Sequence, residues 1–285
     1  MKRCKQTDLL SFLKMHDIYP KRTLSQNFLI DENIVDKMLS LLQLEENDHI
    51  LEIGPGAGAL TQKLLTHKIH LTCVEKDEIL SDLLQFETNH SLTFETIKHD
   101  ILKWDFSTLC PTTRWKIISN LPYHITSKIL KQLAKERARL TSCIVMVEKG
   151  YAEDLMKAKD KHDATSFILH LCFSITPAFQ VSKTCFYPRP RIDSSVLLLI
   201  PKPPLLVNEQ HFFKLIEVLF QHKRKTIGST LRQCFPMITH EDLQAIGDLS
   251  ALRPEKLSPI EAFKIFNLYS HKLGQEDAPY AATNH

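Results

Sequence analysis

A glycine-rich turn between two apolar segments constrains the fold of this chain more than any other feature. Residues 54–58 read Gly-Pro-Gly-Ala-Gly. The apolar run 49–53 precedes them, and Leu60, Leu64 and Leu65 follow at helical spacing. A strand, a glycine turn and a helix in this order open a β-α-β unit of a mostly parallel sheet. Because glycine lets the backbone approach a ligand closely, we expect an α/β fold with a ligand beside this turn.

Polar residues follow the next three predicted strands. Strand 70–74 ends at Glu75, strand 92–97 is followed by Asp100, and strand 116–119 delivers Asn120. The carboxyl ends of parallel strands meet at one edge of a sheet, where open α/β sheets bind ligands. Glu75 would bind a ribose diol there, and Asp100 would accept an adenine amino group. These features predict an adenosine cofactor, a dinucleotide or another, without specifying the chemistry.

The tetrapeptide Asn120-Leu121-Pro122-Tyr123 suits a flat ring that carries an amine. Such an amine is a poor nucleophile, so a catalyst must orient its N–H bonds. The Asn120 side-chain oxygen and the Leu121 carbonyl can accept those bonds, and Pro122, which has no N–H, would hold the loop with its carbonyls facing the ligand. The Tyr123 ring offers a stacking surface worth about 1–3 kcal/mol per base. A plain turn would use the same residue types, so the tetrapeptide alone does not decide.

Positive charge is concentrated in two stretches. Residues 1–22 carry six Lys and Arg against two Asp and Glu, and residues 183–232 carry nine against three. Both stretches are candidates for contacts with phosphates, although a solvated charged surface would have the same composition. Two late strands, 176–181 and 195–200, are predicted to pair antiparallel at the sheet edge, followed by a proline-rich linker near residue 204.

The seven cysteines are scattered, odd in number and without a Cys-x-x-Cys pair. This pattern argues against a disulfide framework and against a zinc site, so we expect reduced thiols, a cytoplasmic location and no metal. The basic start leads into an interrupted apolar pattern rather than a signal-peptide core, and no run approaches the length of a membrane span.

Eight motifs together resemble the ribosomal RNA adenine N6-dimethyltransferase family, in the family's order from about residue 20 to 270. They are PKRTLSQNFLID (20–31), ILEIGPGAGALT (50–61), VEKD (74–77), HDILKWDF (99–106), NLPY (120–123), FYPRPRIDSSV (186–196), HKRKTIGSTL (222–231) and LRPEKLS (252–258). The resemblance implies a class I methyltransferase that uses S-adenosylmethionine. It implies a Rossmann-like seven-stranded sheet in residues 1–204, a small helical RNA-binding domain in 205–272 and a disordered tail in 273–285.

The resemblance also implies the reaction and the residues that serve it. A monomeric enzyme would dimethylate the N6 amines of two adjacent adenosines in the 3′-terminal hairpin loop of 16S rRNA, within the small ribosomal subunit or its precursor. Phe186 would sandwich a flipped adenine against Tyr123. The cofactor-binding residues would be Asn27, Leu29, Gly54, Glu75, Asp100 and Asn120. The RNA contacts would include Lys21, Arg22, Arg189, Arg191, Lys223, Arg224 and Lys225.

Some positions depart from the family pattern. His124 stands where the family often has Asn, and we expect it to be a loop residue or an RNA contact rather than a base. Thr126-Ser127, Glu148-Lys149-Gly150 and residues 163–166 also differ, which affects the wall that faces the substrate.

Two other functions remain open. A large-subunit adenine methyltransferase of the antibiotic-resistance type shares the QNF, glycine-turn and N-x-P-Y motifs, but HKRKTIGSTL and LRPEKLS argue against it. A ribosome-assembly or mitochondrial transcription factor would keep the fold without the activity. The intact residues Asn120, Tyr123, Glu75 and Asp100 argue against that loss.

Overall fold

The computed structural model describes residues 6–88, 93–110, 112–157, 163–204 and 208–273, without the side chains of Arg22, Tyr269 and residues 271–273. The chain divides into two compact units, Met1–Leu155 with Cys172–Pro203 and Met156–Leu171 with Pro204–His285. The main division therefore falls beside the proline-rich linker. Residues 156–171, which the sequence placed in the first domain, group with the second unit instead. The predicted tail lies, from residue 274 on, outside the described residues.

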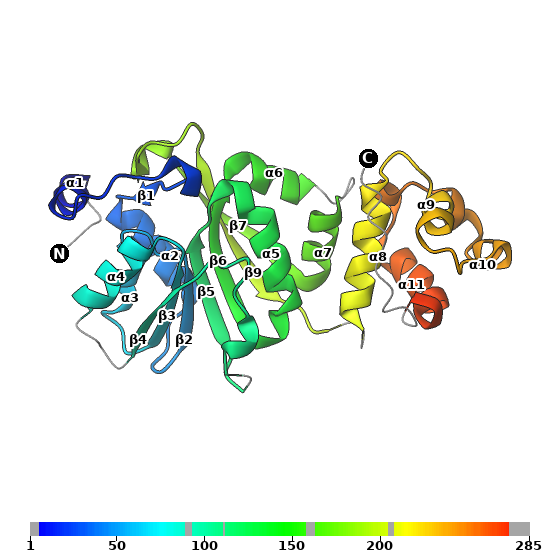
Figure 1. Cartoon of the computed structure of the whole chain (residues 1–285), viewed down its shortest axis with the longest axis horizontal. Coiled ribbons are helices and arrows are strands. Elements are labelled where there is room, and N and C mark those ends of the chain that lie inside the picture. Colours follow the sequence, from blue (N-terminus) through cyan, green and yellow to red (C-terminus); the bar gives the residue numbers. More distant parts are fainter. Residues whose placement is uncertain (1–5, 89–92, 111, 158–162, 205–207, 274–285) are drawn as a thin grey trace. The chain divides into compact units, whose positions relative to one another are not determined.

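Seven strands form one sheet in the first unit, in the order β4-β3-β2-β5-β6-β9-β7 (Figure 1). Strands β2 to β6 run parallel, whereas β9 is antiparallel to both β6 and β7. The prediction of an α/β sheet with a late antiparallel pair at its edge is confirmed. The strands are β2 (His49–Ile53), β3 (His70–Glu75), β4 (Phe94–Lys98), β5 (Trp115–Asn120), β6 (Leu140–Glu148), β7 (Phe173–Val181) and β9 (Ser194–Pro201).

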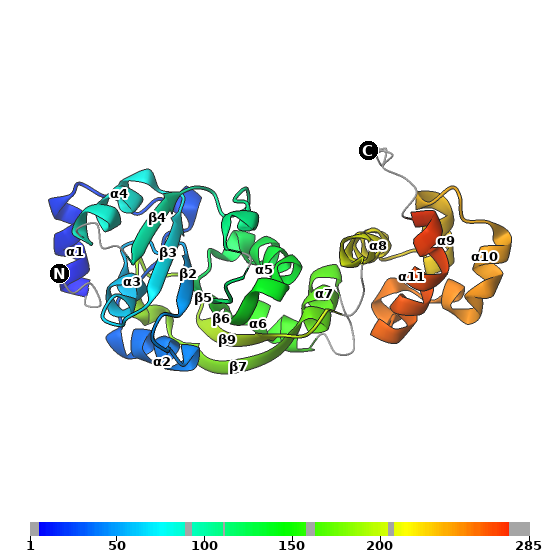
Figure 2. The ribbon, with the colours of Figure 1, turned by 90° about the horizontal axis from the view of Figure 1, so that it is seen from below.

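The strand order reverses between β2 and β5, and this reversal determines which face of the sheet each helix covers. Connections from β2 run outward to β4, and those from β5 run outward to β6, so right-handed crossovers place their helices on opposite faces. Helices α2, α3 and α4 lie on one face and α5 on the other (Figure 2). Such a switch point is where open α/β sheets bind ligands. The helices of this unit are α1 (Gln6–Met15), α2 (Glu32–Leu42), α3 (Ala59–Leu64), α4 (Glu78–Glu87), α5 (Thr126–Lys135) and α6 (Lys149–Lys157).

Helix α2 shows how the sequence builds one of these elements. The Asp31 carboxylate accepts hydrogen bonds from the backbone N–H groups of Asn33 (3.0 Å) and Ile34 (3.4 Å), which begins the helix. The apolar positions then recur at helical spacing, and Val35 and Met38 are fully buried in the main core beneath the sheet.

A short two-stranded sheet joins two motifs that are far apart in the chain. Strand β1 (Phe28–Leu29) pairs antiparallel with β8 (Phe186–Tyr187), with Phe28 opposite Tyr187 and Leu29 opposite Phe186. Phe28 also packs in a small cluster with Ala57 of the glycine turn and with buried residues of α1 and α4. These contacts hold the segment before α2 close to the glycine turn.

The second unit is helical. It contains α7 (Ala164–Cys172), which crosses the division, and α8 (Glu209–Gln221), α9 (Ile227–Cys234), α10 (His240–Ala245) and α11 (Pro259–Leu273). Its core is rich in phenylalanine: the Phe212 ring stacks on Phe263 with centroids 4.6 Å apart and meets Phe266 edge-on. Within the described part of the chain, no helix combines the length and apolarity that crossing a bilayer requires.

Candidate active site

A cavity opens at the carboxyl ends of β2, β3, β4 and β5. Five segments line it: 23–29 before α2, the glycine turn with its flanks (52–57, with Ala59 and Leu60), residues 74–76, residues 99–102, and residues 120–125 with Ile129. The polar residues predicted at successive strand ends are therefore neighbours in space. Of the implied cofactor residues, all six lie on this lining: Asn27, Leu29, Gly54, Glu75, Asp100 and Asn120.

The glycine turn takes a backbone path that side chains disfavour. Gly54, Gly56 and Gly58 have φ angles of +67°, +56° and +82°, in the left-handed region that glycine enters at low cost. A Cβ on Gly56 would lie 3.2 Å from the Phe28 ring, whereas a Cβ on Gly54 would meet nothing within 4 Å. The space above Gly54 is thus open to a ligand.

Glu75 is fixed beside this turn by two backbone hydrogen bonds. Its Oε2 accepts from the Gly56 N–H at 2.9 Å and its Oε1 from the Asp77 N–H at 2.8 Å. Burial raises the pKa of the Glu75 carboxyl, although these hydrogen bonds oppose the shift. A carboxylate oxygen that already accepts one bond has lone pairs left for ribose hydroxyls.

Asp100 is held in its charged form. Its Oδ2 lies 2.9 Å from the Lys76 Nζ, and its Oδ1 accepts from the Leu102 N–H at 3.0 Å. The hydrogen bond from Lys76 lowers the pKa of Asp100. The Lys76 side chain is 59% exposed, so an adenine amino group bound to Asp100 would share the carboxylate with this ammonium group.

The side-chain amide of Asn120 has a defined orientation. Its Nδ2 donates to the backbone carbonyl of Asn27 at 3.0 Å. A carbonyl oxygen only accepts, so the nitrogen must face Asn27 and the Oδ1 is left as an acceptor for a ligand. The end of β5 is itself tied to β2, because the Ser119 Oγ donates to the Ile53 carbonyl at 2.6 Å.

The other three residues of the tetrapeptide, Leu121, Pro122 and Tyr123, are each held by hydrogen bonds within the protein. The Leu121 side chain is buried and its N–H donates to the Met146 carbonyl at 3.0 Å. The Pro122 carbonyl accepts from the Ile125 N–H and the Thr126 Oγ1, at 3.2 and 3.1 Å. These bonds commit the Pro122 carbonyl to the helical turn that leads into α5, and the prediction that carbonyls of this loop face a ligand stays a prediction. The Tyr123 hydroxyl is tethered to the Ser194 Oγ at 2.8 Å, and burial raises its pKa.

Phe186 and Lys21 each have partners within the protein. Phe186 is only 3% exposed and packs in the main core, and it is not among the residues that line the cavity. The sandwich of an adenine between Phe186 and Tyr123 stays a prediction. Lys21 forms an ion pair with Asp77 at 2.9 Å, and its side chain is 45% exposed, so its contact with RNA also stays a prediction.

The remaining predicted RNA contacts lie on the surface. Arg189 and Arg191 are exposed in the segment after β8, and Lys223, Arg224 and Lys225 are exposed between α8 and α9 of the second unit. The side chain of Arg22 lies outside what the structure describes. His124 is exposed at the cavity and its Nδ1 lies 3.0 Å from the Ser25 Oγ.

Sequence reasoning missed one buried acid of the cavity. Glu52 is 1% exposed, and its Oε2 accepts from the Thr61 Oγ1 at 2.7 Å and from the Cys73 Sγ at 3.6 Å. Burial raises the pKa of Glu52 to about 7. The available signal was an acid within the apolar strand that leads into the glycine turn, a position where a charge needs a specific partner.

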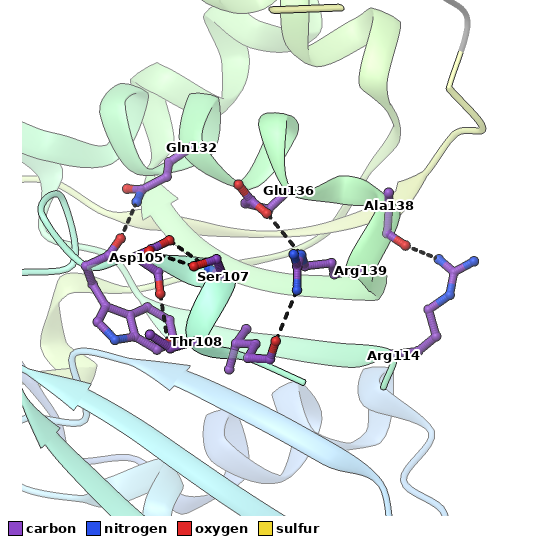
Figure 3. A network of polar contacts seen from close by, with 10 residues as sticks. Asp105, Ser107, Thr108, Arg114, Gln132, Glu136, Ala138 and Arg139 are labelled. Carbon is purple, nitrogen blue, oxygen red and sulfur yellow. Dashed lines mark hydrogen bonds and ion pairs between the residues drawn. The ribbon is translucent and has the colours of Figure 1, made fainter. Parts of the chain in front are cut away.

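The loop that carries Asp100 is fastened to α5 and to the following turn, η4 (Arg137–Arg139). The Gln132 Nε2 donates to the Trp104 carbonyl at 3.1 Å, and Arg139 donates to the Leu109 carbonyl at 3.0 Å while it pairs with Glu136 (Figure 3). Helix α5 starts directly after the tetrapeptide. Helix α5 therefore supports both polar walls of the cavity, the one around Asp100 and the one around Asn120.

A family model described as ribosomal RNA adenine dimethylase matches residues 19–271. The chain belongs to this family. The dimethylase is 37% identical over 277 residues to the ribosomal RNA small subunit methyltransferase A of Protochlamydia amoebophila, a match that covers 93% of this chain and 97% of that protein. The protein of the same name from Chlamydia felis is 32% identical, with coverages of 95% and 97%.

Two solved structures share the fold of the dimethylase. A dimethyladenosine transferase from Plasmodium falciparum superimposes with a TM-score of 0.70 at 21% identity, covering 86% of this chain and 98% of that one. The 23S rRNA methyltransferase ErmE gives a TM-score of 0.61 at 21% identity, covering 87% and 100%. The class I methyltransferase fold is confirmed, and the dimethylase uses S-adenosylmethionine.

The cavity of the dimethylase fits this cofactor. The open face of Gly54 and the fixed carboxylate of Glu75 suit a ribose, and the charged Asp100 suits an adenine amino group. Among the residues that the structure describes, no group of three or more His, Cys, Asp or Glu is placed to hold a metal ion.

Proposed function

We propose that this dimethylase modifies the N6 amines of two adjacent adenosines in the 3′-terminal hairpin loop of 16S rRNA. It would act in the cytoplasm as a monomer, on the small ribosomal subunit or its precursor. The observation that carries the proposal is the Asn120 amide. Its bond to Asn27 leaves a neutral acceptor, Oδ1, on the same cavity that holds the acids suited to the cofactor.

The chemistry of an adenine amine explains the choice of groups. Its nitrogen lone pair is delocalised into the ring, so the N–H bonds must be oriented before the nitrogen can attack. The Asn120 Oδ1 and the Leu121 carbonyl are acceptors for these bonds, and neither charges the site. Bound S-adenosylmethionine supplies an electrophilic methyl group, and the residues contribute positioning. The amine becomes acidic once it is alkylated, so a strong general base is not required.

The same acceptors permit a second transfer to one nitrogen. A monomethylated amine retains one N–H, which one neutral acceptor can still orient. The Tyr123 ring, held at its hydroxyl by Ser194, would stack on the flipped base. The exposed residues Arg189 and Arg191 in the first unit, and Lys223, Arg224 and Lys225 in the second, are proposed to contact RNA phosphates.

The choice of the small subunit is supported by the relatives. The Protochlamydia and Chlamydia proteins are named for the small subunit and match nearly their whole length. ErmE, which acts on 23S rRNA, shares the fold at 21% identity. A large-subunit target is the second candidate, because the motifs QNF and N-x-P-Y are common to both kinds of enzyme, whereas HKRKTIGSTL and LRPEKLS argue against it.

The test is methyl transfer from labelled S-adenosylmethionine to undermethylated small subunits, undermethylated large subunits and their naked rRNAs. We expect label in 16S rRNA, and mass spectrometry should locate N6,N6-dimethyladenosine at two adjacent positions. Label confined to 23S rRNA would transfer the assignment to the second candidate. Binding to the small subunit without any label would indicate an assembly factor that lacks the activity.

A further inference from the structure

The segment from Lys21 to Asn27 contributes residues 23–27 to one wall of the cavity, and the residue that anchors it lies outside the cavity lining. Its residue Asn27 provides the carbonyl that orients Asn120. The anchor of the segment is Asp77, which follows β3 and does not itself line the cavity. The Asp77 side chain is only 2% exposed, so its charge depends on partners within the protein.

Two residues of the segment meet a single oxygen of Asp77. The Oδ2 accepts from the Lys21 Nζ at 2.9 Å and from the Gln26 Nε2 at 2.8 Å. The Gln26 Oε1 in turn accepts from the Lys21 N–H at 2.7 Å, which closes the group into a ring of three residues. Hydrogen bonds from Lys21 and Gln26, together with the positive charge of Lys21, keep the pKa of Asp77 low in spite of its burial.

This group is coupled to both sides of the site. The Asp77 N–H donates to Glu75, and Gln26 is the chain neighbour of Asn27. Opening of the segment would break the ion pair from Lys21 and the hydrogen bond from Gln26 to this carboxylate. The ring therefore favours the arrangement in which Asn27 reaches Asn120.

We propose that Asp77 is a positioning residue, which places Asn27 through Lys21 and Gln26 and thereby orients the Asn120 amide over the cofactor. The proposal deepens the proposed function and rests on it, because Asn120 is the same reaction centre. It assigns Lys21 to this ring rather than to RNA. Because the segment also forms a wall of the cavity, the ring slows the departure of S-adenosylmethionine.

A charge exchange between two residues tests the ring. Gln26→Glu is isosteric, removes the N–H donor and sets a second carboxylate against Asp77. Asp77→Asn removes the buried charge that Lys21 faces. The double variant Gln26→Glu/Asp77→Asn restores one carboxylate and one amide in exchanged places. The amide at position 77 can then donate to the carboxylate at position 26, and Lys21 keeps an acidic partner. Lys68→Ala, which breaks an exposed ion pair with Glu46, is the matched control.

Two measurements without RNA decide the proposal: the dissociation rate of S-adenosylmethionine, and amide hydrogen exchange of residues 21–29 in the free protein. We expect each single variant to dissociate the cofactor about tenfold faster and to exchange this segment faster. The double variant should recover most of both losses. In turnover with RNA, kcat should fall in the single variants while RNA affinity stays constant, and Lys68→Ala should match the wild type throughout.

The proposal would be overturned if the effects of the two single variants on cofactor dissociation simply added in the double variant. Unchanged amide hydrogen exchange of residues 21–29 in the single variants would also overturn it. If Asp77→Asn alone fails to fold, faster exchange in Gln26→Glu supports the ring and unchanged exchange overturns it. Because both decisive measurements omit RNA, an error in the proposed RNA target would leave their outcome untouched.

Discussion

The Asn120 amide donates from its Nδ2 to the Asn27 carbonyl at 3.0 Å, across 93 positions of the chain. This bond joins the QNFL motif to the NLPY motif and determines which end of the amide faces a substrate. The sequence predicted the Asn120 side-chain oxygen as an acceptor and assigned Asn27 only to cofactor binding. The bond to the Asn27 carbonyl is what leaves this oxygen available for a ligand. Asn27 therefore contacts the proposed reaction centre through its backbone.

Replacing Asn120 with Asp tests this arrangement at constant shape. A carboxylate has no N–H for the Asn27 carbonyl and would place a negative charge against it, so the orientation of the acceptor is lost. We expect methyl transfer to fall by about a hundredfold or more, measured with labelled cofactor. Asn33→Asp, an exposed change in the first turn of α2, is the control. Near-normal rates for Asn120→Asp or Asn120→Ala would remove Asn120 from the mechanism.

Much of the cavity could be predicted because its residues lie at the ends of parallel strands. Gly54, Glu75, Asp100 and Asn120 each lie at or just after the end of a predicted strand, and the topology of an open sheet brings such positions to one edge. Periodicity and glycine placement, both local features, were sufficient for this part.

The burial of Phe186 and the partner of Lys21 could not be predicted in the same way. Both depend on pairings between distant segments, β1 with β8 and residues 21–26 with Asp77. No local pattern encodes which face a two-residue strand turns to the core. A basic run likewise has the same composition whether its charge meets RNA or a buried carboxylate.

Two glycines of the turn should respond differently to alanine. In Gly54→Ala the added Cβ enters open space above a positive-φ residue, so it meets the ligand. In Gly56→Ala the Cβ meets the Phe28 ring at 3.2 Å. We expect Gly54→Ala to weaken S-adenosylmethionine binding at least tenfold by calorimetry, with a loss of stability of about 1 kcal/mol. Gly56→Ala should be less stable than Gly54→Ala; equal melting temperatures would contradict the contact with Phe28.

The hydrogen bond between Tyr123 and Ser194 should make the effects of substitutions at these two positions on kcat non-additive. Tyr123→Phe keeps the ring and loses the 2.8 Å contact, and Ser194→Ala loses the same contact from the other side. We expect each to lower kcat by roughly twofold to fivefold and the double variant to lose no more than either, because they remove one interaction. Tyr123→Ala should lose about 1–3 kcal/mol of stacking in addition. Independent effects of Tyr123→Phe and Ser194→Ala would exclude the tether.

The basic turn of the second unit should contribute to RNA affinity through charge. Replacing Lys223, Arg224 and Lys225 with Ala should weaken RNA binding and lower the slope of log K against log salt by about 2 to 3. Cofactor affinity should not change, since the cavity lies in the first unit. A double variant of Lys68 and Lys98, which pair with acids elsewhere, is the charge control. An unchanged slope would assign the run to ordinary solvated surface.

Glu52 should make the stability of the dimethylase depend on pH. Its pKa is about 7 in the folded protein, above its ordinary value of 4.5, so the folded state holds the proton more tightly than the unfolded state. Below pH 4.5 both states are protonated. Between about pH 4.5 and 7 the unfolded state loses the proton while the folded state keeps it, so stability falls as the pH rises. Above pH 7 the loss, at most about 3 kcal/mol, is complete.

The variant Glu52→Gln isolates this contribution. The amide keeps the shape of the side chain and an acceptor for Thr61 but does not titrate. Burial raises the pKa of Glu75 as well, so the wild type and the variant will share part of the pH dependence, and their difference reports Glu52. Urea unfolding at pH 5 and pH 8 should show the wild type losing more stability than Glu52→Gln over this interval. Equal losses in the two proteins would mean that Glu52 is ionised at both pH values, with Thr61 and Cys73 sufficient to hold its charge.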